Sequence, residues 1–371
     1  MRYAWLPFLI LAASALGAEP APVEALPGDF KGGALQPALA LSPSGAVAMV
    51  FGTDTGEIYV SLLEPGASTF TAPSLVAKED KLTLAGRRGP RITATAKALI
   101  VSFITRAGNL VCCTSTDAGK LWTGPVQVNA KEGSAEEGLH ALVSRPGGEV
   151  LFIWMDRGGR GPQEMGQDVF SARARIAVKD RDNFTQPEKV STAAVCPCCA
   201  PSLSYGGGKI AAMWRSEIKG CRDLYVSALE QQKRGFGEGK KQGSGTWKIN
   251  ACPMDGGGLA LDGEGKAWTA WRREKTVYAS TPESPELPLG TGKDPVIAVG
   301  SKGTVALWTD RDAIYMKRLG ETGEAARLST PAAGIKQGSA SVVALPDGGF
   351  LAAWEEQGPD KKGTIKTVHL P

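Results

Sequence analysis

The sequence lacks the features that would place the chain among nucleic-acid-binding, helical or membrane proteins. Its 42 basic and 38 acidic residues nearly balance, so the composition gives no electrostatic footprint for nucleic acid, which would need a basic face or stripe. Long amphipathic helical patterns are missing, and beyond the N-terminus no segment approaches the length of a membrane span. We therefore expect no nucleic-acid partner and no membrane insertion.

Runs of like charge are few and short. Arg87-Arg88, Lys240-Lys241 and Lys361-Lys362 lie beside glycine in expected loops. Solvated turns are the usual explanation of such pairs, and we predict nothing more from them.

The N-terminal residues have the pattern of an export signal. Arg2 supplies a positive start, residues 4–16 are apolar, and small residues follow as a cleavage site. The apolar stretch is too short for a permanent anchor, and no cysteine stands at the cleavage point for lipid attachment. We expect residues 1–18 to be a signal peptide and residues 19–371 to form a single periplasmic or secreted domain, where disulfides can form.

Turn-forming residues are abundant, and they separate a repeated strand pattern. The 47 glycines and 24 prolines bound many short apolar runs, which indicates an all-β chain. Seven of these runs end in a large aromatic residue, and all but one begin with glycine: Gly45–Phe51, Lys97–Phe103, Gly148–Trp154, Gly208–Trp214, Gly265–Trp271, Gly303–Trp308 and Gly349–Trp354.

Each aromatic-ending run occupies the second place in a unit of four strands. A shorter strand precedes it, often opened by proline, and a third strand with a hydrophobic middle follows. A weaker fourth strand closes most units, as in Trp247–Ile249 of the fourth. Radial stacking covers both faces of such sheets, so the pattern predicts a β-propeller of four-stranded blades with seven repeats. The last unit lacks an outer strand, which Val23–Leu26 could supply; a β-sandwich or two stacked sheet domains is the weaker alternative.

One motif indicates a family. Ser115-Thr-Asp117-Ala-Gly119-Lys-Leu-Trp122 matches the Asp-box, Ser-x-Asp-x-Gly-x-x-Trp, and lies between the third and fourth strands of the second unit. The chain therefore resembles the sialidase-like (BNR-repeat) β-propeller superfamily over its whole mature length. The resemblance implies a structural turn, in which Ser115 and Asp117 satisfy backbone groups and Trp122 packs between sheets. Sialidases of this kind have six blades, so a six-bladed propeller is the alternative to our count.

The resemblance also implies where a ligand would bind. Turns from the second to the third strand, and connections from one unit to the next, share one face of a propeller, and binding residues are often on such loops. We name this region the central funnel. A sialidase needs an arginine cluster for the substrate carboxylate and a tyrosine nucleophile. Tyr59, Tyr225, Tyr278 and Tyr315 repeat in the third strand, where packing explains them better. The ligand-binding candidates are Arg91, Arg215, Arg272, Asp255 and Glu217.

Cysteines gather at neighbouring blades of the same face. Cys196, Cys198 and Cys199 open the fourth unit, Cys221 follows in its turn, and Cys252 opens the fifth. Disulfides are the favoured interpretation in an exported protein. The alternative is a thiolate site for copper or zinc, with Met254 or His140 nearby, although the spacing matches no standard zinc pattern. Cys112-Cys113 is a separate pair.

Three functions remain open from the sequence. The first is an exported sialidase-like propeller that binds a glycan or another acidic ligand in the central funnel, with exo-sialidase-type glycoside hydrolysis as its enzymatic form. The second is a metal-binding or redox-sensitive protein that uses the cysteine cluster. The third is a non-catalytic interaction scaffold. The sequence names no catalytic residue and no certain cofactor.

Overall fold

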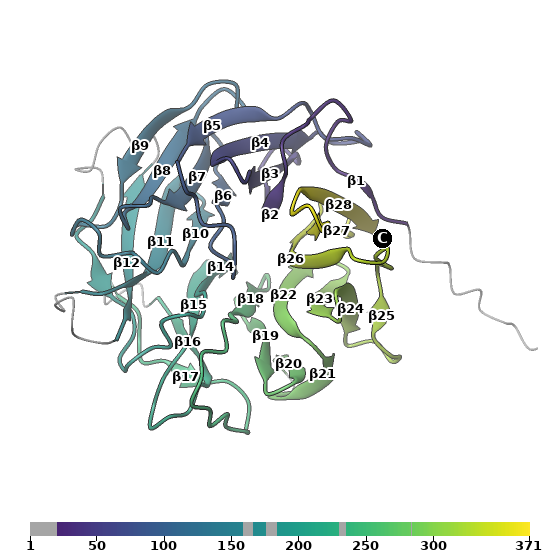
Figure 1. Cartoon of the computed structure of the whole chain (residues 1–371). Helices are drawn as coiled ribbons and strands as arrows, with labels where there is room; N and C mark the ends of the chain where they lie inside the picture. Colours follow the sequence, from purple (N-terminus) through teal and green to yellow (C-terminus); the bar gives the residue numbers. More distant parts are fainter. Residues whose placement is uncertain (1–20, 159–165, 176–183, 230–234, 283) are drawn as a thin grey trace, which may run out of the picture.

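The computed structural model describes residues 21–158, 166–175, 184–229, 235–282 and 284–371. The predicted signal peptide, residues 1–18, lies outside them. The described chain forms seven antiparallel four-stranded sheets arranged in a ring (Figure 1), which is a seven-bladed β-propeller. This confirms the all-β prediction and the count of seven units, and the six-bladed and sandwich alternatives were wrong. Among the described residues, no helix is long and apolar enough to cross a membrane.

Blades one to three use the chain in order, from the inner to the outer strand. Blade one contains β2 (Leu35–Leu41), β3 (Val47–Gly52), β4 (Glu57–Leu63) and β5 (Ser74–Lys78). Blade two contains β6 (Arg91–Ala94), β7 (Leu99–Ile104), β8 (Leu110–Ser115) and β9 (Thr123–Gln127). Blade three contains β10 (His140–Arg145), β11 (Glu149–Asp156), β12 (Asp168–Arg175) and β13 (Glu188–Lys189).

Blades four to six repeat the order. Blade four contains β14 (Ser202–Gly206), β15 (Lys209–Arg215), β16 (Leu224–Ala228) and β17 (Lys240–Lys241). Blade five contains β18 (Gly257–Leu261), β19 (Ala267–Arg273), β20 (Thr276–Ser280) and β21 (Leu287–Thr291). Blade six contains β22 (Lys293–Gly300), β23 (Gly303–Asp310), β24 (Ala313–Leu319) and β25 (Ala326–Arg327).

The seventh blade joins the two ends of the described chain. β26 (Lys336–Ala344), β27 (Phe350–Gln357) and β28 (Gly363–Leu370) are completed by β1 (Val23–Glu24), which pairs with β28 in the register Val23–Thr367 and Glu24–Lys366. The N-terminal segment therefore supplies the outer strand that the last repeat lacks, as the sequence predicted.

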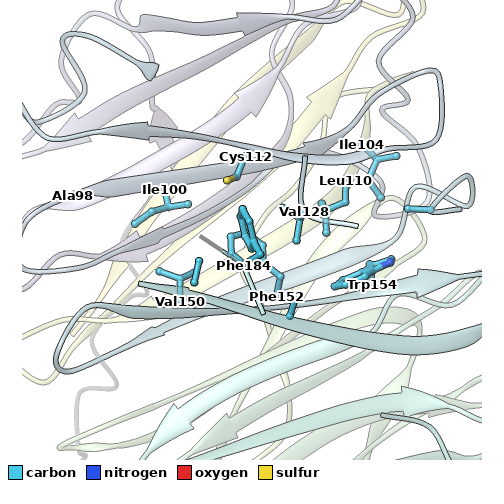
Figure 2. Close-up of a cluster of buried hydrophobic side chains, with 13 residues drawn as sticks. Ala98, Ile100, Ile104, Leu110, Cys112, Val128, Val150, Phe152, Trp154 and Phe184 are labelled. Atoms are coloured by element: carbon cyan, nitrogen blue, oxygen red, sulfur yellow. The ribbon is translucent and has the colours of Figure 1, made fainter. Parts of the chain in front are cut away.

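Aromatic residues at the ends of the second strands fill the spaces between blades. All seven are buried, with exposed fractions of 0–3%: Phe51, Phe103, Trp154, Trp214, Trp271, Trp308 and Trp354. Figure 2 shows one such space between blades two and three, where Trp154 and Phe152 lie opposite Ile100, Leu110 and Cys112. Burial of these rings removes large apolar areas from water and holds neighbouring blades together.

The tyrosines of the third strands complete this packing. Tyr59, Tyr278 and Tyr315 stack on the aromatic residue paired with them in the second strand of the same blade. Tyr225 is paired in the same way opposite Trp214. These four side chains are structural, as their repeated position indicated.

Candidate functional site

A channel of about 230 Å³ runs along the propeller axis, lined by residues of the inner strands of all seven blades. Most of the lining residues are small or apolar, such as Ala38, Leu142 and Val342. Polar side chains gather where the inner strands begin, and we name this end the channel mouth. It consists of Gln36, Arg87, Arg91 and Ser339, which line the channel, and of Asp294 and Asp255, which interact with each other beside Arg87.

The backbone at the mouth takes a conformation that is rare for residues other than glycine. Gln36, Asp294 and Ser339 have φ angles of 55°, 53° and 50°. Each lies at a register shift near the start of an inner strand, in blades one, six and seven respectively. Such β-bulges re-aim side chains, and strained backbone of this kind is concentrated at functional sites.

A half-buried carboxylate ties two of these bulges together. Glu355 Oε2 accepts a hydrogen bond of 2.7 Å from the Gln36 amide, and Glu355 Oε1 accepts one of 2.9 Å from the Ser339 hydroxyl. The Gln36 side chain in turn accepts a hydrogen bond of 2.8 Å from the Gly89 amide of the next blade. Burial raises the pKa of Glu355 above its ordinary value despite these donors. This network fixes the side of the mouth formed by blades seven, one and two.

Two arginines from the connection into blade two lie in the mouth. Arg91 donates to the carbonyl oxygens of Arg87 and Pro90, at 2.5 and 3.3 Å. Arg87 Nη1 is buried and has no hydrogen-bond partner among the described residues. A Cβ added at Gly256 would lie 2.6 Å from the Ala200 carbonyl oxygen and 2.9 Å from Arg87 Nη1, so this guanidinium lies against the backbone that leads into blade five. Neither arginine has a carboxylate within 4 Å in the described chain.

The electrostatic environment of Arg91 is unfavourable to its charge. Burial and the neighbouring Arg87 lower the pKa of Arg91 to about 9. His140 is 1% exposed, and burial together with Arg91 lowers its pKa to about 3. The imidazole is therefore neutral and does not repel Arg91, but it supplies no negative charge either. An anion entering the mouth would meet two incompletely compensated guanidinium groups.

Two aspartates lie on the opposite side of the mouth. Asp255 is 1% exposed and its Oδ2 lies 2.6 Å from Arg272 Nε, although without the alignment of a hydrogen bond. Burial and the charge of Asp255 raise the pKa of Asp294 to about 6, while Arg87 and Arg272 act in the opposite direction. The mouth thus has arginines facing a pair of interacting carboxyl groups.

The structure places three of the five predicted ligand-binding residues at the channel mouth and two away from it. It brings Arg91, Arg272 and Asp255 to the mouth or its edge. Arg215 is 1% exposed and donates to the backbone oxygens of Asp255, Arg222 and Arg272. Its guanidinium therefore supports the loops and does not face a ligand. Glu217 is also away from the channel, paired with Arg222 at 2.6 Å.

Trp247 contacts both Arg215 and Arg272. Their guanidinium carbons lie 5.3 and 5.1 Å from its ring centroid, so the indole holds both through cation–π contacts. The prediction that Trp247–Ile249 is the outer strand of blade four was wrong, because β17 at Lys240–Lys241 takes that place. Trp247 therefore lies outside the sheet, and its ring packs against the guanidinium groups of the two arginines.

The cysteines do not all meet. The sulfur atoms of Cys196, Cys198 and Cys199 lie within 4.8 Å of one another, and all three residues are buried. Cys252 lies close enough to Cys198 to affect its pKa, but it is exposed and outside this group. The half-buried Cys221 is also outside the group. Burial and the hydrogen bond with Cys196 raise the pKa of the Cys199 thiol to about 12. All seven cysteines are thiols in this structure.

Cys112 and Cys113 belong to the core. They lie on opposite faces of β8, where Cys112 packs between blades two and three and Cys113 packs between blades one and two. Burial raises the pKa of Cys113 to about 12. Both thiols act as small apolar side chains.

The Asp-box segment forms a hydrogen-bonded turn remote from the mouth. Ser115 Oγ accepts from the Gly119 amide at 2.8 Å, and Asp117 Oδ1 accepts from the amides of Lys120 and Leu121 at 3.1 and 3.0 Å. Trp122 packs against the hydrophobic cluster between blades one and two. The segment is a structural turn.

Sequence reasoning missed Arg87, Gln36 and Ser339. Arg87-Arg88 was interpreted as a solvated turn, but Arg87 lines the channel and Arg88 pairs with Glu137. The sequence carries one signal for the bulges at the mouth: a proline follows both Gln36 and Asp294, at the same position of their units. A bulge at one of these positions therefore predicts a bulge at the other.

Comparisons with known proteins identify the fold and no family. No family model matches the sequence, and no curated protein matches it either. Among solved structures, the BP39L lectin from Burkholderia pseudomallei aligns with a TM-score of 0.60 at 13% identity, over 90% of this chain and 96% of that chain. An ulvan lyase aligns at 0.58 and 9% identity, over 94% and 96%. Virginiamycin B lyase from Staphylococcus aureus aligns at 0.55 and 13% identity, over 94% and 98%. At these identities the similarity establishes the β-propeller fold alone.

Proposed function

We propose that the channel mouth binds an acidic ligand, and that a glycan bearing a carboxylate or sulfate is the favoured class. The observation that carries the proposal is the pair Arg87 and Arg91, two cations that line the channel and form no salt bridge within 4 Å in the described chain, although the charge of Arg87 acts on Asp294. Guanidinium groups bind carboxylate and sulfate oxygens with charge-assisted hydrogen bonds. An anion would accept a hydrogen bond from the free Arg87 Nη1 and offset the repulsion between the two cations.

The size of the channel and the proteins with a similar fold support a sugar as the ligand. A channel of about 230 Å³ can admit a small group such as the end of a chain. Propellers of similar shape include a lectin and an ulvan lyase bound to a glucuronic-acid-containing disaccharide repeat. We also propose that the protein is exported, for which the support is the sequence of residues 1–18.

We propose binding rather than sialidase hydrolysis. The third-strand tyrosines stack within the blades, and no tyrosine lines the described channel. The Asp-box is a structural turn and contributes nothing to the mouth. The pKa of Asp294 is raised to about 6, which suits a proton donor, but the tyrosine nucleophile of a sialidase is missing from the described residues that line the channel.

The first prediction concerns the arginine pair. Arg91→Gln should weaken binding of a glucuronate-containing oligosaccharide by about 10-fold or more, because a charge-assisted hydrogen bond contributes ~1.5–3 kcal/mol. Isothermal titration calorimetry measures the affinity, with the matching neutral oligosaccharide as a second ligand. The affinity of the wild type should also fall as salt rises.

Arg106→Gln is the matched control. Arg106 is exposed in the turn between β7 and β8, on the same face of the propeller, so the same loss of charge occurs away from the mouth. Equal affinities of R91Q and wild type for the acidic oligosaccharide would refute the proposal. Equal losses of affinity in R91Q and R106Q would show that binding depends on the overall charge of the protein and not on the mouth.

A further inference from the structure

A cluster of three cysteines lies in the turn that leads into blade four. Cys196, Cys198 and Cys199 have exposed fractions of 0, 8 and 1%. Cys196 Sγ lies 3.6 Å from Cys198 Sγ and 3.0 Å from Cys199 Sγ. The Cys196 amide donates to the Arg215 carbonyl at 2.8 Å, which anchors the turn to the end of β15.

The arrangement of the sulfur atoms is close to that of a metal site. A metal–sulfur distance of about 2.3 Å gives sulfur–sulfur separations of about 3.8–4.0 Å in tetrahedral or trigonal geometry. The three sulfur atoms, all within 4.8 Å of one another, need to move by only about 1 Å to reach it. The Cys196 thiol is hydrogen-bonded to both Cys198 and Cys199, and the Cys198 thiol also interacts with Cys252. The sulfur atoms of the three cysteines therefore face a common centre.

Arg215 supplies a second, independent observation. It is a fully buried cation whose donors reach backbone oxygens only, and no carboxylate pairs with it in the described chain. Its charge acts on Cys199. A buried cation without a counterion is costly, and a negatively charged thiolate–metal group at Cys199 would supply that counterion.

We propose that Cys196, Cys198 and Cys199 bind one Cu(I) ion in a three-coordinate thiolate site. Binding releases the thiol protons, and the resulting anionic copper–thiolate group pairs with Arg215. The site is separate from the arginine pair of the mouth, so the proposal does not depend on acidic-ligand binding.

The ligand set favours Cu(I) over Zn(II). Thiolates alone suit both ions, but structural zinc requires four ligands in tetrahedral geometry. The group consists of three cysteines, with no histidine or carboxylate in it. Cys252 interacts with Cys198 but is exposed, and His140 lies outside the group. Three buried soft ligands without a fourth match Cu(I), which accepts low coordination numbers and is protected from water by burial.

A disulfide is the competing state of the same residues. Cys196 and Cys199 have the spacing of a Cys-x-x-Cys pair and the shortest sulfur–sulfur distance. That bond would leave Cys198 buried as a lone thiol beside Cys252, and it would leave Arg215 without a counterion. Copper binding accounts for all three sulfur atoms and for the arginine.

The second prediction is tested by loading the full mature chain with Cu(I) under anaerobic, reducing conditions. A colourless Cu(I) complex with a competing chelator is the probe, and bound copper is counted by elemental analysis after desalting. We expect about one copper per chain for wild type and less than about a tenth of that for the double variant C196S/C199S. Cys221→Ser is the matched control and should keep the full content, because Cys221 lies outside the group.

Three results would overturn the proposal. The first is a reduced wild type that binds no copper. The second is a loss of bound copper in the variant Cys252→Ser, or a preference for Zn(II) that disappears in this variant. Either result would show that Cys252 is a fourth ligand. The third is an X-ray absorption spectrum of the loaded wild type that shows fewer than three sulfur ligands, a measurement that stays valid if the double variant fails to fold.

Discussion

Glu286 illustrates how a single side chain can hold a loop against a blade. Its carboxylate accepts hydrogen bonds from both terminal nitrogens of Arg273, at 2.9 and 2.7 Å, and one from the Ser244 amide at 2.8 Å. The Arg273 guanidinium in turn lies 4.2 Å from the Tyr278 ring centroid. The side chains of Arg273 and Glu286 are 16% and 17% exposed, so solvent screens this pair less than a surface salt bridge.

The third prediction follows from the pKa of Glu286. Its hydrogen bonds, above all those from Arg273, lower the pKa from 4.5 to about 2. The folded protein therefore holds fewer protons here than the unfolded chain, and this contribution to stability is full above pH 4.5 and lost as pH falls towards 2. Glu286→Gln should lower the free energy of unfolding at neutral pH by ~1–3 kcal/mol.

Denaturant unfolding at several pH values tests the third prediction. The difference between E286Q and wild type should shrink as the pH falls through this window. Glu264→Gln is the control, because Glu264 pairs with Lys266 while 74% exposed and such pairs contribute little. A difference that does not change with pH would contradict the assignment.

Residue roles could be predicted only where a local pattern determines them. Ser115, Asp117 and Trp122 act within one turn, and the motif gives their roles directly. Arg87 and Arg215 depend on residues of other blades, such as Gly256 and the carbonyl of Arg272. Sequence alone cannot show which of two arginines faces the channel and which is buried under a loop.

At the scale of elements, the second strands were the most predictable. Each is an apolar run ending in a buried aromatic, because both faces are covered by neighbouring blades. The outer strands are short and partly exposed, so their sequences carry a weak pattern. Blade four shows the consequence: β17 is the two-residue Lys240–Lys241, whereas the more apolar Trp247–Ile249 looked like a better strand.

The fourth prediction concerns β1, the outer strand that closes the ring. It makes two cross-strand pairs with β28, the Ala25 amide donates to the Ile365 carbonyl at 2.9 Å, and Ala25 is 3% exposed. A chain that starts at residue 27 should lose ~1–4 kcal/mol of unfolding free energy relative to residues 19–371, from a few hydrogen bonds and the lost burial.

Denaturant unfolding and native-state hydrogen exchange together test this closure. Amides of β28 should exchange faster in the shortened chain, while those of β11 in blade three should change less. Unchanged stability and unchanged protection of β28 would show that β1 does not close the ring.

At the scale of the whole molecule, the ring brings together residues that are far apart in the chain. Arg87 from the connection into blade two, Asp255 from blade five and Asp294 from blade six interact at one mouth. Repeat counting predicts that such loops share a face, and therefore a funnel. Repeat counting cannot predict how close each loop residue lies to the channel. Glu217 was expected in the funnel, but it pairs with Arg222 away from the channel.

The fifth prediction depends on this convergence. Burial and Asp255 raise the pKa of Asp294 from 3.8 to about 6. Between these pH values the folded protein holds a proton that the unfolded chain has released, so the unfolding free energy falls as pH rises through the window. Asp294→Asn removes the ionisation and should be more stable than wild type by ~1–3 kcal/mol above pH 6 but not below pH 3.8.

Asparagine is suited to this position because, like aspartate, it tolerates the left-handed backbone at φ 53°. Asp312→Asn is the matched control, since Asp312 has a φ of 66° but is exposed. Unfolding free energies of the three proteins across this pH range decide the matter. If D294N and wild type keep the same difference at every pH, the two carboxyl groups do not interact at the mouth. If D312N shows the same pH-dependent gain, the effect belongs to general surface charge and not to the convergence of the blades.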